Sequence, residues 1–355
     1  MREVFFLNNT KKIVLTSMGT LIGAGFASGR EIYQFFFRFG KMGLLGIVVS
    51  GILTGIIIYI TLKISNMKEI DNYDELIENI NENKKHTKLK YILKIIANIF
   101  LLISFYIMVS GFGAYINQVY NVEKTMACSI FAIILYLVLL KNIQGILNIN
   151  NILVPIILIL ILYLGIKNLP YIIGTRPIIV AEEKTSNWLI YSILYTSYNS
   201  IILIPVLIAM RKYINNKKEI LSISILSTAC IIILALCIFG LMLKQNSNIG
   251  ELEMPILEIV SGYGIIIEKI YGLIIIISIF TSAISVNYSF LENISTSKKY
   301  KRNLFIICIS SILISNIGFS TLVRILYPLF GFFGIIQLIF LFKSYLNLLE
   351  KNREN

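Results

Sequence analysis

Glycines crowd the first long apolar stretch of the sequence. Gly19, Gly23, Gly25 and Gly29 fall within eleven residues, and a glycine inside a helix costs about 1 kcal/mol relative to alanine. One explanation is close packing of helices through small residues four positions apart. The other is a helix interrupted near Gly23–Gly25. An interruption frees backbone carbonyls that can bind a cation and backbone N–H groups that can bind a carboxylate.

A second polar cluster, Ser197-Tyr198-Asn199-Ser200, lies in the middle of another apolar stretch. Short polar side chains compete for backbone hydrogen bonds and can line a broken segment. Ordinary hydrogen bonding to a neighbouring helix, worth about 0.6 kcal/mol per bond, is the alternative. Because this cluster and the glycines occupy corresponding places in the two halves of the chain, we expect a second helix break here.

A stripe of hydroxyl groups marks a third apolar stretch. It consists of Ser278, Thr281, Ser282, Ser285 and Ser289. This spacing places the side chains on one face of a helix. Such a face either bonds to a neighbouring helix or lines a hydrophilic path, where its oxygen atoms suit a hard cation such as sodium.

Arg30 and Glu31 are adjacent charges late in the glycine-containing stretch. A charge at the centre of a bilayer costs about 2.5–3.5 kcal/mol on insertion scales. We therefore expect both residues in a wet outer vestibule, where they act as a gate. The four cysteines lie in apolar runs and His86 stands alone in a lysine-rich segment, so the sequence predicts neither disulfides nor a cofactor metal.

Long apolar helices must position these residues. Of 355 residues, 57% are hydrophobic and 14% are charged, and the mean hydropathy is +0.80. A soluble domain has roughly 25% charged residues, so soluble enzymes and disordered regulators are excluded. Because the apolar runs are continuous and do not alternate, the composition predicts an all-α integral membrane protein.

Ten transmembrane helices are predicted, with both termini in the cytoplasm of a cell-membrane protein. The spans lie near residues 12–38, 43–65, 90–119, 125–141, 149–167, 186–211, 218–244, 264–292, 303–320 and 323–346. This topology places 22 lysines and arginines inside and 9 outside, as the positive-inside rule requires. The same rule accounts for the net charge of +13 without a nucleic-acid partner.

The order of spans repeats within a single transmembrane domain. Residues 11–168 and 186–346 each contain an interrupted span, a plain span, a long loop, a long span and two shorter spans. Five spans per half reverse the direction of the second half, which predicts an inverted five-plus-five repeat. The stretch 251–259 is expected to form a short helix over the outer vestibule.

The segment Gly23-Ala24-Gly25-Phe26-Ala27-Ser28-Gly29-Arg30-Glu31, followed by Gln34-Phe35-Phe36 and Phe39-Gly40, resembles the YkvI-type bacterial membrane proteins, an amino-acid permease family. The resemblance implies the amino acid–polyamine–organocation superfamily and its LeuT-like fold, with the first and sixth helices discontinuous. Two departures are visible. The sixth span lacks the usual glycines, and the fifth span carries no lysine or aspartate that could couple protons.

The resemblance also implies site residues. A sodium ion would be bound by the carbonyls of Gly19, Ile22 and Ser278 and by the hydroxyls of Thr281 and Ser282. The substrate would contact Thr20, Leu21, Gly23, Ala24, Gly25, Tyr106, Ser197, Tyr198, Asn199 and Ser200.

We therefore expect a secondary active transporter for a small amino acid or related zwitterion that is coupled to sodium and works by alternating access. Its partners would be the solute and the lipid bilayer, and it would need no cofactor besides the coupling ion. Three alternatives stay open: a sensor or receptor subunit with the same fold, a proton-coupled permease and a uniporter. An enzyme is not expected, because the spans contain no histidine, aspartate or Cys–His pair.

Overall fold

The computed structural model describes residues 2–70, 73, 75–76, 87–140, 150–168, 187–214, 217–243, 249–294 and 299–354. All regular structure in these residues is helical. The predicted loop at 66–89 and the connections at 141–149 and 169–186 lie largely or wholly outside the described residues.

A described helix covers each of the ten predicted ranges, the first as three short pieces. The helices are α1 (Arg2–Leu21), α2 (Ala24–Ala27), α3 (Arg30–Phe35), α4 (Lys41–Met67), α6 (Thr87–Tyr120), α7 (Lys124–Leu139), α8 (Asn150–Lys167), α10 (Trp188–Met210), α11 (Lys217–Met242), α12 (Pro255–Ser261), α13 (Ile265–Ile294), α14 (Tyr300–Ser315) and α15 (Phe319–Glu354), with 3-10 turns η1 (Phe37–Phe39), η5 (Arg211–Tyr213) and η6 (Ile249–Glu251).

Six of these helices, in the part of the chain that the structure describes, are long and apolar enough to cross a membrane. They are α4, α6, α10, α11, α13 and α15. The helices α7 and α8 are apolar but shorter. The protein is therefore a multi-pass helical membrane protein, and the full count of ten spans stays a prediction.

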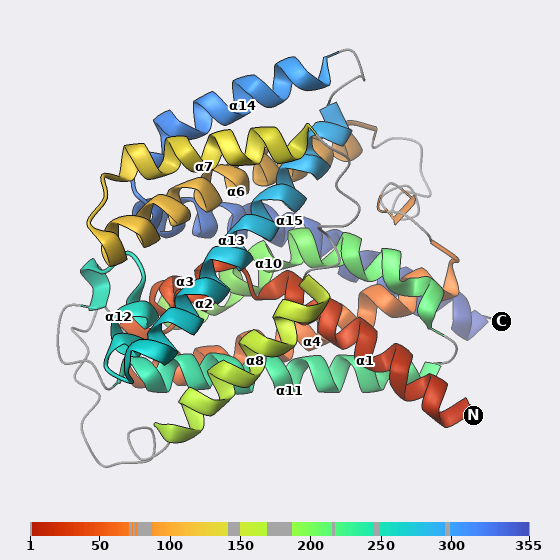
Figure 1. Ribbon diagram of the computed structural model, residues 1–355. Coiled ribbons are helices and arrows are strands. Elements are labelled where there is room, and N and C mark those ends of the chain that lie inside the picture. Colours follow the sequence, from red (N-terminus) through yellow and green to blue (C-terminus); the bar gives the residue numbers. More distant parts are fainter. Residues whose placement is uncertain are drawn as a thin grey trace.

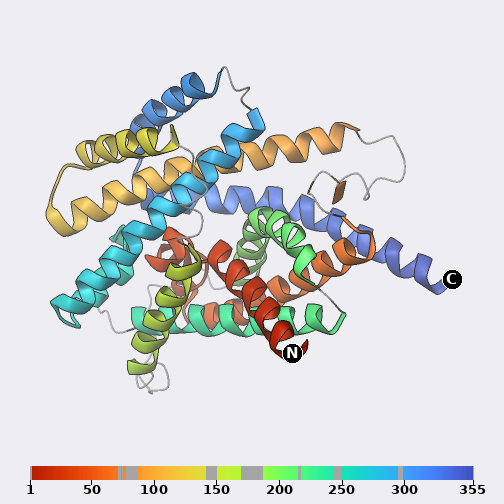
Figure 2. The ribbon, with the colours of Figure 1, turned by 45° about the vertical axis from the view of Figure 1, so that its right-hand side comes forward.

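The helices form one bundle with α1, α2 and α3 in its interior (Figure 1). The start of α1 and the end of α15 lie at the same end of the bundle, and α12 lies at the opposite end. In the turned view, α1, drawn in red, runs from the middle of the bundle to the N-terminal end of the chain (Figure 2). The cytoplasmic location of both termini stays a prediction.

Helices that occupy corresponding positions in the two halves pack against one another. The pairs are α1 with α10, α4 with α11, α6 with α13, and α7 with α14. The first span therefore lies beside the sixth, and the third beside the eighth. The pair α1 and α10 joins the glycine-containing stretch to the polar cluster, and a further contact between α2 and α13 joins the first span to the hydroxyl stripe.

Small residues allow α15 to approach α10 closely. A Cβ atom added to Gly334 would lie 2.1 Å from the Ser197 carbonyl oxygen, and one added to Gly331 would lie 2.8 Å from the Leu194 carbonyl oxygen. Backbone atoms cannot swing away as a flexible side chain can. Close approach through glycine is a common way for membrane helices to associate, because it maximises van der Waals contact.

We expect Gly334→Ala to destabilise the protein by about 1–3 kcal/mol, the usual cost of overpacking a tight contact. The melting temperature of the purified protein should fall. Gly262→Ala is the matched control, because an added Cβ atom there would meet its nearest atom at 3.4 Å, an ordinary contact. Equal melting temperatures for the two variants would contradict the tight α10–α15 contact.

Candidate functional site

The first span is interrupted after α1. The Ile22 N–H donates to the Met18 carbonyl at 2.8 Å, and the next backbone bond begins only at Ala27, which donates to the Gly23 carbonyl at 3.0 Å. Gly23 itself is extended, with φ −89° and ψ −171°. The predicted break in the first helix is thus confirmed. In the described part of the chain, the N–H groups of Gly23 to Phe26 form no backbone hydrogen bond with the carbonyls of Gly19 to Ile22.

A second turn follows at Gly29, which has φ +80°. This left-handed conformation is accessible to glycine without the strain that a Cβ atom would add. The turn starts α3, in which Tyr33 donates to the Gly29 carbonyl at 2.9 Å. Two glycines therefore cut the first span into α1, α2 and α3.

The predicted break at Ser197–Ser200 is wrong. The helix α10 is continuous from Trp188 to Met210. Its polar side chains bond back to the carbonyls of their own helix: Ser197 to Ile193 at 2.7 Å, Asn199 to Tyr195 at 3.0 Å and Ser200 to Ser197 at 2.7 Å. The segment contains no glycine, and these bonds are compatible with a helix. Thr196 additionally reaches the Ser50 carbonyl of α4 at 3.2 Å, which is the interhelical bonding left open above.

Glu31 lies inside the bundle, which corrects the predicted wet vestibule position. Its residue is only 4% exposed. The Tyr198 hydroxyl donates to Glu31 Oε2 at 2.5 Å. The other carboxylate oxygen lies against Gly25, because a Cβ atom added there would be 2.2 Å from Oε1. The carboxylate therefore links α2, α3 and α10 beside the break, and it brings together two predicted substrate residues, Gly25 and Tyr198.

Aromatic rings surround this carboxylate. Tyr198 stacks on Tyr327 of α15 with ring centroids 4.8 Å apart and on Phe35 of α3 at 5.4 Å. Tyr195 meets the Tyr198 ring edge-on at 5.5 Å. The rings are buried and fix the orientation of the Tyr198 hydroxyl. The neighbourhood of Glu31 therefore combines one acidic group with hydroxyls and ring faces.

The predicted sodium ligands lie on α1, at the break and on α13. Ser278 and Thr281 are buried, and the Thr281 hydroxyl donates to the Ile277 and Ser278 carbonyls of its own helix at 3.0 and 3.2 Å. Donation leaves lone pairs on the hydroxyl oxygen for a cation. The Tyr271 hydroxyl of α13 donates to the Ala27 carbonyl at 2.6 Å, so α13 is fastened to α2. Joint binding of sodium by the two helices stays a prediction.

The remaining predicted substrate residues are divided between two places. Thr20 bonds to the Thr16 carbonyl within α1 at 2.9 Å, and Leu21 and Ala24 are buried beside the break. Tyr106 on α6 instead shares a hydrogen bond of 2.9 Å with Ser310 of α14, a helix that packs on α6 and α7. The structure therefore directs the Tyr106 hydroxyl toward α14, and its contact with substrate stays a prediction.

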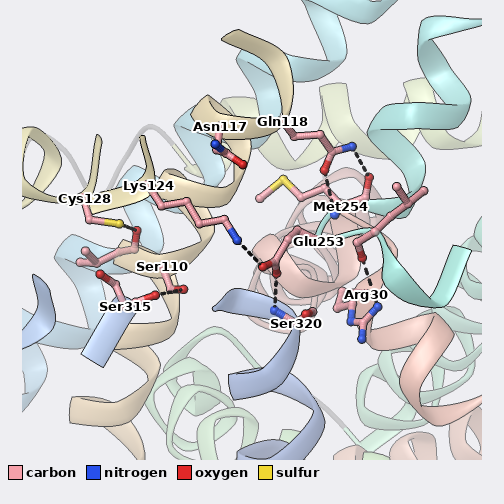
Figure 3. A network of polar contacts seen from close by, with 12 residues as sticks. Arg30, Ser110, Asn117, Gln118, Lys124, Cys128, Glu253, Met254, Ser315 and Ser320 are labelled. Atoms are coloured by element: carbon pink, nitrogen blue, oxygen red, sulfur yellow. Dashed lines mark hydrogen bonds and ion pairs between the residues drawn. The ribbon is translucent and has the colours of Figure 1, made fainter. Parts of the chain in front are cut away.

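Residues 249–254, here named the cap segment, directly precede α12 and are held by polar contacts with residues of several helices (Figure 3). Arg30 Nη1 donates to the carbonyls of Gly250 and Leu252 at 2.8 and 3.1 Å. Gln118 of α6 exchanges two hydrogen bonds with the backbone of Met254, at 3.3 and 3.2 Å. Arg30 is 3% exposed, so it too is buried, which corrects its predicted wet position.

Glu253 is the second anchor of the cap segment. Its carboxylate pairs with Lys124 of α7 at 2.6 Å and accepts the Ser320 N–H of α15 at 2.6 Å. Burial alone raises the pKa of this carboxyl, but the lysine ammonium and the backbone N–H outweigh burial, so the pKa lies below its ordinary value. The segment then continues into α12, where Ile256 donates to the Ser28 carbonyl at 3.0 Å.

The residue patterns missed several members of this site. Glu253 was included only within a predicted surface helix, and Gln118, Lys124, Tyr271 and Tyr327 were not singled out. Their partners lie far away in the chain, so no local spacing indicates them. The only available signal was the polar character of Gln118 and Lys124 at the end of an apolar span.

In the part of the chain that the structure describes, the fold and the site define an all-helical membrane protein with an interrupted helix inside its bundle. No family model matches the chain. Two proteins of Bacillus subtilis (strain 168) are similar over most of their length. The uncharacterized membrane protein YkvI is 24% identical over 345 residues, covering 92% of this chain and 93% of the relative. The uncharacterized protein YyaD is 24% identical over 330 residues, covering 92% and 94%.

Solved structures support the fold. MhsT in complex with L-phenylalanine has a TM-score of 0.56 at 16% identity, covering 90% of this chain and 87% of that chain. A mutant of the Eremococcus coleocola manganese transporter has a TM-score of 0.50 at 13% identity, covering 94% and 70%. Both have the LeuT-like fold. The resemblance to YkvI-type proteins is therefore confirmed, and the likeness to solved structures shows the fold alone.

We expect Glu253→Gln to weaken the cap segment by about 1 kcal/mol at neutral pH, because it removes a partly buried charge-assisted contact. The lowered pKa of Glu253 sets the sign of the pH dependence. Its contribution is complete above the ordinary glutamate pKa of about 4.3 and is lost as the pH falls through the lowered folded-state pKa.

The measurement is the difference in melting temperature between wild type and variant across this pH range. The exposed Glu258 on α12 provides the control variant, Glu258→Gln. A difference that stays constant down to the acid limit of folding would contradict an ionised, paired Glu253.

Proposed function

We propose that the protein is a secondary active transporter for a small amino acid or related zwitterion, coupled to sodium and working by alternating access. The observation that carries the proposal is the break between α1 and α2 in the interior of a LeuT-like bundle. Unpaired backbone groups inside a membrane are costly, and in transporters they are tolerated where they bind ions and substrates.

The proposed substrate site lies beside the break between α1 and α2, at Gly23 and the start of α2. The N–H groups of Gly23 to Phe26, which lack helical partners at the break, would donate hydrogen bonds to the carboxylate of the solute. Gly23 borders open space, because no atom lies within 4 Å of the position that its Cβ atom would occupy. The Tyr198 and Tyr195 rings supply apolar surface nearby. The MhsT complex with L-phenylalanine supports an amino acid as the solute class.

The proposed sodium site uses the backbone carbonyl groups freed at the end of α1. The carbonyls of Gly19 and Ile22 have lost their helical partners, and the hydroxyl face of α13 provides further oxygen atoms. All proposed ligands are neutral, so a bound ion keeps its full charge. Such a site is expected to be weak and to require a closed, dry surrounding.

The arrangement of helices supports alternating access. Four pairs of helices that correspond in the predicted inverted repeat pack against one another, which is compatible with such a repeat. The cap segment closes the end opposite the termini with hydrogen bonds from Arg30 and Gln118. We propose that this closed end is the outer end and that Arg30 serves as its gate. Uptake into proteoliposomes, with and without a sodium gradient, tests the function, and solute binding without uptake would favour a sensor.

We expect Gly23→Ala to reduce substrate binding at least tenfold without lowering stability. The new methyl group would enter open space, and the φ and ψ of Gly23 are allowed for alanine. A thermal-stability screen of the purified protein against the common amino acids should show stabilisation of wild type and little of the variant. Gly262→Ala, far from the break, should behave as wild type. Unchanged ligand stabilisation in Gly23→Ala would exclude the space at Gly23 from the binding site.

We expect the double variant Thr281→Ala and Ser282→Ala to lose sodium-dependent stabilisation and to fold normally, because a hydroxyl in a membrane helix contributes only about 0.6 kcal/mol to packing. Ser289→Ala on the same helix is the control, since Ser289 is exposed and bonds to its own helix at 2.9 Å. The readout is the melting temperature in sodium against potassium salt. Wild-type sodium dependence in the double variant would disprove this assignment.

A further inference from the structure

Glu31 is a buried acid without a counter-ion. In the described part of the chain, Glu31 accepts a hydrogen bond from Tyr198, packs closely on Gly25 and forms no ion pair. The neighbouring guanidinium of Arg30 does not compensate it, because that group is turned to the carbonyls of the cap segment.

Five elements pack against α3, and the hydroxyl groups near Glu31 come from two of them. The elements in contact are α2, η1, α10, α11 and α15. From α10 and α15 they contribute three hydroxyl groups, those of Tyr195, Tyr198 and Tyr327. The cations Arg38 and Arg324 lie on adjoining elements, but Arg38 stacks over the Tyr191 ring at 4.3 Å and Arg324 is exposed. On α11, Cys237 packs against Gly165 of α8.

An ionised carboxylate in this setting is unfavourable. Removing a carboxylate from water without a partner cation carries a large free-energy cost, and one hydroxyl donor compensates only part of it. A buried carboxylate therefore needs a bound cation. Once water reaches the carboxylate, water solvates its charge and the cation can leave. A site with this property exchanges a cation whenever the bundle changes from closed to open.

We propose that Glu31 is a proton-binding site that takes up and releases one proton in each transport cycle. The proposal rests on the transport function above and adds a proton to its ions. In the closed state the carboxyl group carries the proton. When the site opens, the O–H bond breaks, the proton passes to water of the open compartment and a carboxylate remains. Re-protonation from water reverses the step before closure.

The geometry favours a proton over a larger cation. The carboxyl group lies flush against Gly25, with Oε1, Cδ and Cγ all within 2.8 Å of the position of an added Cβ atom. Sodium needs several further oxygen ligands, and an ammonium group needs room beside the carboxylate. A proton needs neither. Tyr198 of α10 donates a hydrogen bond to Glu31 of α3. The charge of Glu31 therefore affects the contact between α3 and α10.

Infrared difference spectroscopy tests the proton directly, without a substrate. Purified wild-type protein in lipid, titrated from acid to alkaline pH, should show the C=O stretch of a protonated, buried carboxyl group that disappears reversibly and shifts in D₂O. Glu31→Gln should lose this band. Glu258→Gln, which removes an exposed carboxyl group, should keep it. Tyr198→Phe should keep the band but shift its frequency, because one hydrogen bond is lost.

A band that is absent, or that does not titrate over the whole pH range in which the protein stays folded, would overturn the proposal. If Glu31→Gln fails to fold, the wild-type titration and the Tyr198→Phe shift still decide it. Uptake of a labelled amino-acid mixture into proteoliposomes separates this proposal from the transport proposal. Uptake whose pH dependence is the same in wild type and Glu31→Gln refutes the proton site alone, whereas a titrating band without any uptake refutes transport alone.

Discussion

The backbone hydrogen bonds of the first span are the constraint on which the rest of this structure depends. A hydrocarbon environment offers no partner for a free N–H or carbonyl group, so an interrupted helix must be enclosed by protein. The chain meets this requirement by packing α10, α11, α8 and α13 around α1 and α2. Side chains satisfy some backbone carbonyls near the interruption. Ser28 donates to the Gly25 carbonyl at 3.1 Å, and Tyr271 donates to the Ala27 carbonyl. The carbonyls of Gly19 to Ile22 and the N–H groups of Gly23 to Phe26, which form no backbone hydrogen bonds with each other, lie within this enclosure.

The first span and α10 differ in how their backbone hydrogen-bonding groups are used. The first span uses glycines to expose backbone groups, whereas α10 keeps every turn and turns its short polar side chains back onto its own carbonyls. In α10 the functional surface is therefore made of side chains, above all the rings and hydroxyls of Tyr195 and Tyr198. A continuous α10 also offers a firm surface for α15, which contacts it through Gly331 and Gly334. The first span thus exposes backbone groups, whereas α10 presents side chains.

The sequence predicts much of this architecture, because hydropathy and glycine clustering are local signals. The helix ranges, the first break and the short helix near 251–259 follow from such signals. The directions in which the Arg30 and Glu31 side chains point do not follow from local signals. Gly29 adopts φ +80° and rotates α3 away from the axis of α2, so neither residue lies where a continuous helix would place it. The continuity of α10 was missed for a related reason: serine and asparagine permit a break, but tertiary packing decides whether one forms.

Gly29 also explains how the closed end and the centre of the bundle are joined. Arg30 and Glu31 are adjacent on α3, yet their side chains reach different regions: Arg30 binds carbonyls of the cap segment and Glu31 meets Tyr198 of α10. A short helix held at both places cannot move without altering both contacts. A movement of α3 would disturb the Arg30 bonds to the cap segment and the bond between Tyr198 and Glu31 together. Adjacent charges on one short helix therefore join the contacts of the capped end to those beside the helix break.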